Sequence, residues 1–272
     1  MALKLGCSIY SYLWSHSFGE ALERVSDLGF KHVEIVSMPP HIWIETPDRR
    51  SWSAAHKALD VNRLELASVN PSCASGINLA NTNPAVREDS VQRLKTTIEF
   101  VHELGGGVLV LPPPVLHSLM PAPFETAWGW VKEGIERCAR HAEGYGVTVG
   151  LENAAGYRFF TTAGLLQRMV DEVASPCVRM VYDVTNGPES EYPPAALRQI
   201  GDCLALIHLS DKSDGNGHLP IGMGQVAFEP IAASLRATGF QGVSVVEVTH
   251  PQASDGALLS AAARLEALGW KR

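Results

Sequence analysis

Short apolar segments alternate with amphipathic segments along the whole chain, and this alternation limits the fold more than any other feature. Eight segments have the length and the apolar content of buried strands: LKLGCSIY, HVEIV, LELASVN, GVLVLP, VTVGLE, VRMVYD, LALIH and VSVVEV. Between them apolar residues recur at the spacing of one helix face, as in Val91, Leu94, Ile98 and Val101. Eight such units in one run predict a closed (β/α)8 TIM barrel, with an open doubly wound sheet as the alternative.

Glycine and proline mark the ends and starts of the expected helices. A glycine, which enters the left-handed region at little cost, follows six of the amphipathic segments: Gly29, Gly105, Gly146, Gly201, Gly239 and Gly269. Pro84 and Pro230 stand near helix starts. No linker or shift in composition interrupts the pattern, so we expect residues 1–272 to form one barrel domain.

Composition and charge argue against several classes of function. No apolar stretch approaches the ~20 residues of a membrane span, and MALKLGCSIYSYLW lacks the features of a signal peptide, so we expect a cytoplasmic protein with no membrane partner. A net charge of −7 without a basic cluster disfavours a nucleic-acid partner. Scattered cysteines without metal-binding spacing predict free thiols at Cys7, Cys73, Cys138, Cys177 and Cys203.

Four residues able to bind a metal stand at or just past the ends of the last four expected strands: Glu152, Asp183, His208 and Glu247. Side chains at these ends of a barrel converge on one mouth. Three carboxylates and one imidazole suit Mn²⁺, Co²⁺ or Mg²⁺, and also Zn²⁺. Each residue alone is more often solvated or a helix cap. Four in register favour a joint site, because a buried carboxylate costs several kcal/mol unless a cation or another partner offsets it.

The segments around these residues form a recognisable set. They are GLEN at 150–153, FFTT at 159–162, VASPCVRMVYDVTN at 173–186, HLSD at 208–211, HLPIGMGQVAF at 218–228 and VVEV at 245–248. Together with ALERVSDLGFKHVEI near the start, this set resembles the xylose-isomerase-like TIM barrel superfamily of sugar phosphate isomerases and epimerases. The resemblance spans essentially the whole chain. It implies that Glu152, Asp183, His208 and Glu247 bind one divalent ion.

The same resemblance implies an activity. In such epimerases the residues matching Glu152 and Glu247 move a proton on the carbon next to a carbonyl, which predicts an isomerase or epimerase of a sugar, keto-sugar or cyclitol. The alternative is a lyase, either like inosose or dehydroshikimate dehydratase or one that cleaves a keto-glycoside. A non-catalytic sugar-binding barrel is less favoured, since a binder does not need two opposed bases. The expected partner is a small sugar or polyol, and relatives suggest a homo-oligomer by analogy.

The chain also departs from the family pattern. Many relatives carry histidine where this chain has Ala154 and Asn186, so we expect a substrate bulkier or less polar than a free hexose. Endonuclease IV belongs to the same superfamily and binds three zinc ions. At the expected positions of its additional ligands this chain has Asn70, Asn186 and Asn216, which argues against an endonuclease IV-like nuclease.

Further residues are candidates for contacts with substrate. His218 opens HLPIGMG and either contacts a substrate oxygen or shapes the following turn. Arg158 is the best candidate to bind an acidic group, with a surface ion pair as the alternative. Trp14, Tyr12 and Trp43 follow the first two strands and form either an apolar wall or ordinary packing. Glu34, inside HVEIV, either binds a substrate hydroxyl or pairs with a polar group of a neighbouring strand.

Overall fold

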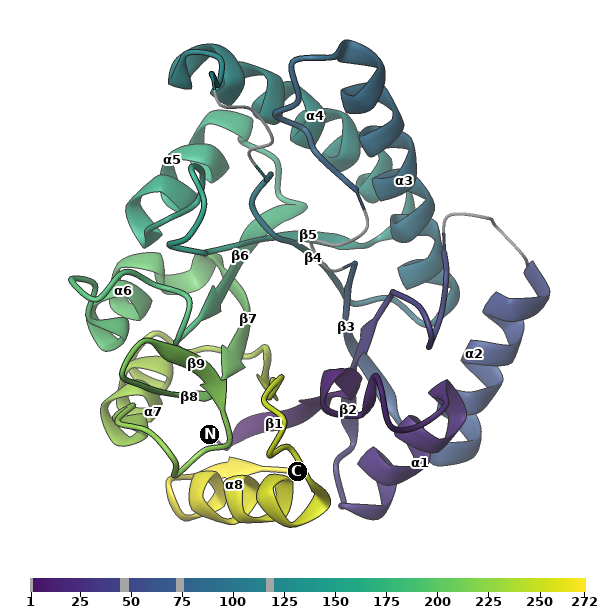
Figure 1. Ribbon diagram of the computed structural model, residues 1–272, viewed down its shortest axis with the longest axis vertical. Coiled ribbons are helices and arrows are strands. Elements are labelled where there is room, and N and C mark those ends of the chain that lie inside the picture. Colours follow the sequence, from purple (N-terminus) through teal and green to yellow (C-terminus); the bar gives the residue numbers. More distant parts are fainter. Residues whose placement is uncertain (1, 45–48, 72–75, 116–119) are drawn as a thin grey trace.

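The computed structural model of the chain describes residues 2–44, 49–71, 76–115 and 120–272. In this part of the chain eight parallel strands form a closed barrel surrounded by helices, as predicted (Figure 1). The barrel strands are β1 (Leu3–Ser8), β2 (His32–Val36), β3 (Glu65–Asn70), β4 (Val108–Leu111), β5 (Thr148–Glu152), β6 (Val178–Asp183), β7 (Leu204–Leu209) and β10 (Val243–Val246). The alternative of an open sheet is wrong, because β10 pairs with β1 and closes the barrel.

Eight helices pack around the outside of the barrel in the described residues (Figure 1). They are α1 (Phe18–Asp27), α2 (Arg49–Asn62), α3 (Pro84–Glu103), α4 (Phe124–Tyr145), α5 (Ala163–Val173), α6 (Pro193–Ile200), α7 (Phe228–Ala237) and α8 (Asp255–Ala267). Two of these helices begin at caps that the sequence makes recognisable: Ser17 and Glu20 form a capping box at α1, and Asn83 caps α3 before Pro84. All six predicted glycines have positive φ.

Three short strands complete the fold. β8 (Asp211–Ser213) and β9 (Asn216–Leu219) form an antiparallel hairpin directly after β7, and β11 (Trp270–Lys271) adds to β1. The hairpin belongs to the loops at the C-terminal ends of the barrel strands, the face on which barrel enzymes carry their active sites. The sequence pattern did not predict it, because NGHL has no apolar alternation.

The apolar core has two parts. The larger part lies between the barrel and its helices, and a smaller one fills the barrel interior with Ala67, Val110, Val181, Leu206 and Val245. Gly150 on β5 borders this interior: a methyl group there would lie 2.5 Å from Val181 Cγ2 and 2.8 Å from Val108 Cγ1. The barrel is therefore closely packed at Gly150.

The remaining structural expectations concern thiols and membranes. Cys7, Cys138, Cys177 and Cys203 are free thiols, as predicted, and Cys73 lies outside the described residues. Among the described helices, none combines the length and the apolar character that crossing a membrane requires.

The packing around Gly150 makes a prediction about stability. Gly150→Ala should lower the free energy of unfolding by about 1–3 kcal/mol, because the added methyl overpacks the barrel interior. The same substitution at Gly144, on an exposed part of α4 with nothing near the new methyl, should be neutral or stabilising by up to ~1 kcal/mol. Denaturant unfolding of both variants checks this, and equal effects would contradict it.

Candidate active site

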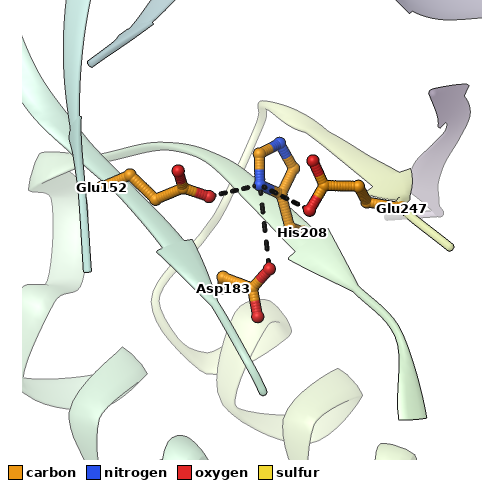
Figure 2. A group of neighbouring side chains, drawn as sticks. All are labelled: Glu152, Asp183, His208 and Glu247. Carbon is orange, nitrogen blue, oxygen red and sulfur yellow. Dashed lines mark hydrogen bonds and ion pairs between the residues drawn. The ribbon is translucent and has the colours of Figure 1, made fainter. Parts of the chain in front are cut away.

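Four buried side chains meet at the C-terminal mouth of the barrel (Figure 2). His208 Nδ1 lies 2.6 Å from Glu152 Oε1, 3.7 Å from Glu247 Oε2 and 4.0 Å from Asp183 Oδ2. Each residue offers one ligand atom, and these atoms all lie within 4.8 Å of one another. The convergence predicted for these four residues is therefore present.

The register between neighbouring strands brings the four side chains to one level of the barrel. Glu152 and Asp183 are the last residues of β5 and β6, and His208 is the residue of β7 that pairs with Asp183. Glu247 follows β10 and its N–H donates to the carbonyl of Leu209, so the main chain is still held against β7 there. Since neighbouring parallel strands end at one level, ligands distant in sequence lie side by side.

The buried carboxylate of Glu34 holds the opposite side of the His208 ring. His208 Nε2 lies 2.8 Å from Glu34 Oε2, which also accepts a hydrogen bond of 2.7 Å from Ser68 Oγ on the adjacent strand β3. A metal-binding histidine commonly donates its second N–H to a carboxylate, which fixes the ring and its tautomer. Of the two roles considered for Glu34, the structure thus shows the pairing with a polar group. Ser68 was missed, although its place in LELASVN marks it as a polar residue in a buried strand.

The electrostatics of the group follow from burial and from its excess of carboxylates. Burial alone would lower the pKa of His208, but Glu34, Glu247 and Glu152 outweigh it and hold that pKa well above its ordinary value. Burial raises the pKa of Glu152, and it raises the pKa of Glu247 to about 8. Burial also opposes ionisation of Glu34, yet the charge and hydrogen bond of His208 keep the pKa of Glu34 below its usual range.

The donor set fits a divalent cation. Asp183 Oδ1 accepts hydrogen bonds from the backbone N–H groups of Thr185 and Asn186, whereas Asp183 Oδ2 is fully buried and has no hydrogen-bond partner in the described structure. A buried carboxylate oxygen left in this state is costly unless a cation is near. Together with one nitrogen and the two other carboxylates it suits a divalent ion.

His218 and Asn186 join the group from two neighbouring loops. His218 Nε2 lies 3.1 Å from Asn186 Oδ1, and its Nδ1 lies 3.4 Å from Glu247 Oε2 and 3.8 Å from Asp183 Oδ2. The structure therefore brings two of the residues predicted to contact substrate next to the four candidate ligands. Whether they meet a substrate stays a prediction.

Arg158 contacts residues at and just before the start of α4. Its guanidinium donates a hydrogen bond of 2.6 Å to the carbonyl of Ala122 and lies 5.5 Å from the ring centroid of Phe124. These contacts hold the loop after β5 against the start of α4. A role of Arg158 toward an acidic substrate stays a prediction.

The aromatic residues of the first two loops differ in exposure. Trp14 is 80% exposed and Trp43 is 43% exposed, whereas Tyr12 is buried and donates a hydrogen bond to Asp255 Oδ1. Tyr12 thus packs into the protein, whereas Trp14 and Trp43 expose apolar surface, and a contact of either with substrate stays a prediction.

The chain is similar to known proteins over most of its length. The family described as "Xylose isomerase-like TIM barrel" matches residues 22–268. A D-psicose 3-epimerase of Agrobacterium fabrum is 25% identical over 254 residues, which cover 88% of this chain and 82% of that protein. The structure of a D-psicose 3-epimerase with D-tagatose from Clostridium cellulolyticum H10 matches with a TM-score of 0.82 at 18% identity, over 99% of this chain and 100% of that one. A 3-keto-D-glucoside 4-epimerase of E. coli matches with a TM-score of 0.82 at 17% identity, over 97% and 99% of the two chains.

The contact between His208 and Glu34 predicts an effect on metal affinity. Glu34→Gln should weaken binding of Mn²⁺ or Co²⁺ by about 10-fold or more, because the neutral amide no longer increases the basicity of the imidazole. The control is Glu65→Gln on β3, whose side chain is 77% exposed. Calorimetric titration of both variants measures the effect. An unchanged affinity in the Glu34 variant would show that this contact does not tune the site.

The raised pKa of Glu247 predicts how metal binding depends on pH. Below about 8 the protonated carboxyl competes with the cation, so affinity should increase as pH rises, by up to about tenfold per pH unit for each proton displaced. Mn²⁺ titrations between about pH 6 and about pH 9 test this. Glu247→Gln should lose part of the pH dependence. An affinity that does not change with pH would contradict the prediction.

Proposed function

The chain belongs to the xylose isomerase-like TIM barrel family, and we propose that it is a divalent-metal-dependent isomerase or epimerase of a keto-sugar or related cyclitol. The reaction moves a proton at the carbon next to the carbonyl. The single observation that carries the proposal is the placement of Glu152 and Glu247, two buried carboxyl groups on opposite sides of the His208 ring nitrogen (Figure 2).

The chemistry requires one ionised and one protonated carboxyl group. One glutamate accepts the proton from the substrate carbon, and the electron pair of the C–H bond moves toward the carbonyl. The other glutamate delivers its proton to the opposite face of the same carbon, which inverts it. For isomerisation the proton goes instead to the former carbonyl carbon, while the hydroxyl proton on the first carbon passes to the former carbonyl oxygen. In the absence of a cation, burial raises the pKa of both groups, which is the direction that favours a protonated carboxyl group.

The chain's own residues would hold the metal and fix the reacting groups. Glu152, Asp183, His208 and Glu247 are the proposed ligands, and Glu34 and Ser68 would keep the His208 ring in place. A divalent ion bound there would polarise the substrate carbonyl and stabilise the negative charge that develops as the proton leaves. Mn²⁺, Co²⁺ and Mg²⁺ are the proposed ions, and Zn²⁺ is an alternative.

The substrate class is supported by the relatives and by the residues beside the ligands. The similar proteins include D-psicose 3-epimerases and a 3-keto-D-glucoside 4-epimerase. Ala154 leaves more room than the histidine of many relatives, and Asn186 pairs with His218. We favour a keto-sugar that carries a further group, for which Trp14 and Trp43 offer exposed apolar surface. His218 and Asn186 would bind its hydroxyl groups, and Arg158 an acidic group if the substrate has one.

The alternative is a lyase, in which the deprotonated substrate loses a β-substituent and no proton is returned. A non-catalytic sugar-binding barrel is a third hypothesis. The opposed glutamates favour proton transfer over binding alone, and they do not separate an epimerase from a lyase. Assembly as a homo-oligomer and a cytoplasmic location remain part of the proposal.

Exchange with deuterated solvent separates the three hypotheses. The protein is incubated with Mn²⁺, Co²⁺ or Mg²⁺ and a panel of ketohexoses, inososes and 3-keto-glycosides in deuterium oxide. Deuterium in a sugar product means an isomerase or epimerase, and loss of water or of the aglycone means a lyase. If no member of the panel exchanges with any metal, the proposal of proton transfer on these substrates is wrong.

The paired glutamates make a prediction about turnover. Glu152→Gln and Glu247→Gln should each reduce kcat by ~10² or more, because an amide keeps an oxygen ligand but does not accept the proton. Metal content is measured in parallel, and Glu133→Gln on an exposed part of α4 serves as the control. A metal-loaded Gln variant with the turnover of the unaltered protein would remove that glutamate from the mechanism.

A further inference from the structure

The carboxylate of Asp211 organises the loop that follows β7. Asp211 is buried and opens β8, and it accepts backbone hydrogen bonds from Lys212 at 3.0 Å, Val226 at 2.9 Å and Gly222 at 2.8 Å. One side chain thus joins the beginning, the middle and the end of the segment 212–226. Hydrogen bonds from backbone N–H groups to an ionised carboxylate are among the stronger ones in proteins.

The packing around the Asp211 carboxylate leaves no room for a side chain at Gly224. Gly224 lies against the carboxylate, and a methyl group on Gly224 would overlap Asp211 Oδ1 and the carbonyl oxygen of Lys212. Gly217, in the same hairpin, differs: a methyl group there would meet nothing closer than Thr185 Oγ1 at 3.6 Å. The chain therefore offers two alanine substitutions in one loop, of which only the first disturbs Asp211.

The segment held by Asp211 carries His218 on β9. The backbone of His218 has a φ of +54°, which a residue other than glycine rarely adopts unless the surrounding structure imposes it. In this conformation His218 Nε2 contacts Asn186, and Nδ1 is buried beside Glu247 with no hydrogen-bond partner in the described structure. The ring thus places a polar atom near Glu247 and Asp183, two of the four candidate ligands.

We propose that Asp211 is a positioning residue, which fixes the loop 212–226 so that the His218 ring stands beside Glu247 and binds a hydroxyl or carbonyl oxygen of the substrate. The inference rests on the proposed function, to which it adds Asp211, a residue outside both the ligand set and the residues proposed to contact substrate. Its physical basis is preorganisation: a hydrogen-bonding group contributes fully only when its own position is already fixed, and a displacement of about 1 Å can cost about 10² in rate.

The first test follows the His218 ring without any turnover. Nitrogen–proton correlation spectra identify the ring signal of His218 by its loss in His218→Ala. In Asp211→Ala and in Gly224→Ala the signal should move toward that of solvent-exposed histidines, whereas in Gly217→Ala it should stay. If it stays in both Asp211→Ala and Gly224→Ala, Asp211 does not position His218 and the inference is overturned. Gly224→Ala keeps the test valid if Asp211→Ala does not fold.

The second test is a double-mutant cycle on a substrate that the unaltered protein converts. Asp211→Ala should reduce kcat/KM by about 10²-fold, and Asp211→Ala with His218→Ala should lose no more than His218→Ala alone. Losses that multiply would show that Asp211 acts independently of His218, which overturns the inference. A protein that converts none of the sugars fails the proposed function instead, and the ring signal still decides the role of Asp211.

Discussion

The charge balance around His208 is the constraint on which the rest of the structure depends. Four buried carboxylates, those of Glu34, Glu152, Asp183 and Glu247, surround this single imidazole. A protonated imidazole neutralises one of these charges, and each further uncompensated buried charge costs several kcal/mol. Protons on Glu152 and Glu247 meet part of this cost through their raised pKa values. A divalent ion would meet the same cost by replacing protons, so the excess of buried negative charge would also be the source of affinity for a cation.

The barrel keeps such a group together because its strands cannot move apart independently. The pairing of Asp183 with His208 and of Val245 with His208 places three successive strands at one level, and each strand is hydrogen-bonded on both sides. The closely packed interior below, around Val181 and Leu206, leaves the strands little space to shift. Under the proposed function, selectivity for a substrate would depend on the loops, where the contacts of His218, Asn186 and Arg158 arise.

The strands and the four candidate ligands could be predicted from the sequence, since both follow from local patterns. Each of the eight apolar segments contains a strand, and each candidate ligand stands at or just past the end of one. Contacts across the barrel could not be predicted from such local patterns. The pairing of Glu34 with His208 joins residues 174 positions apart, so the sequence left two roles open for Glu34. The end of α5 at Ala174, with a φ of +50°, was equally hidden, because alanine carries no signal for a left-handed turn.

The asparagines at the places expected for additional metal ligands explain why one ion and a sugar are the better hypothesis. Asn70 Nδ2 donates to Glu247 Oε1 at 3.4 Å, Asn186 Oδ1 contacts His218, and Asn216 is exposed on β9. A neutral amide is a weaker ligand for transition metals than an imidazole or a carboxylate, but it both donates and accepts hydrogen bonds. The Asn70 amide thus contacts a candidate ligand, and the Asn186 amide contacts His218 beside that group. A phosphodiester would require additional positive charge at this mouth, whereas the hydroxyl groups of a sugar match amides and an imidazole, which donate and accept hydrogen bonds in turn.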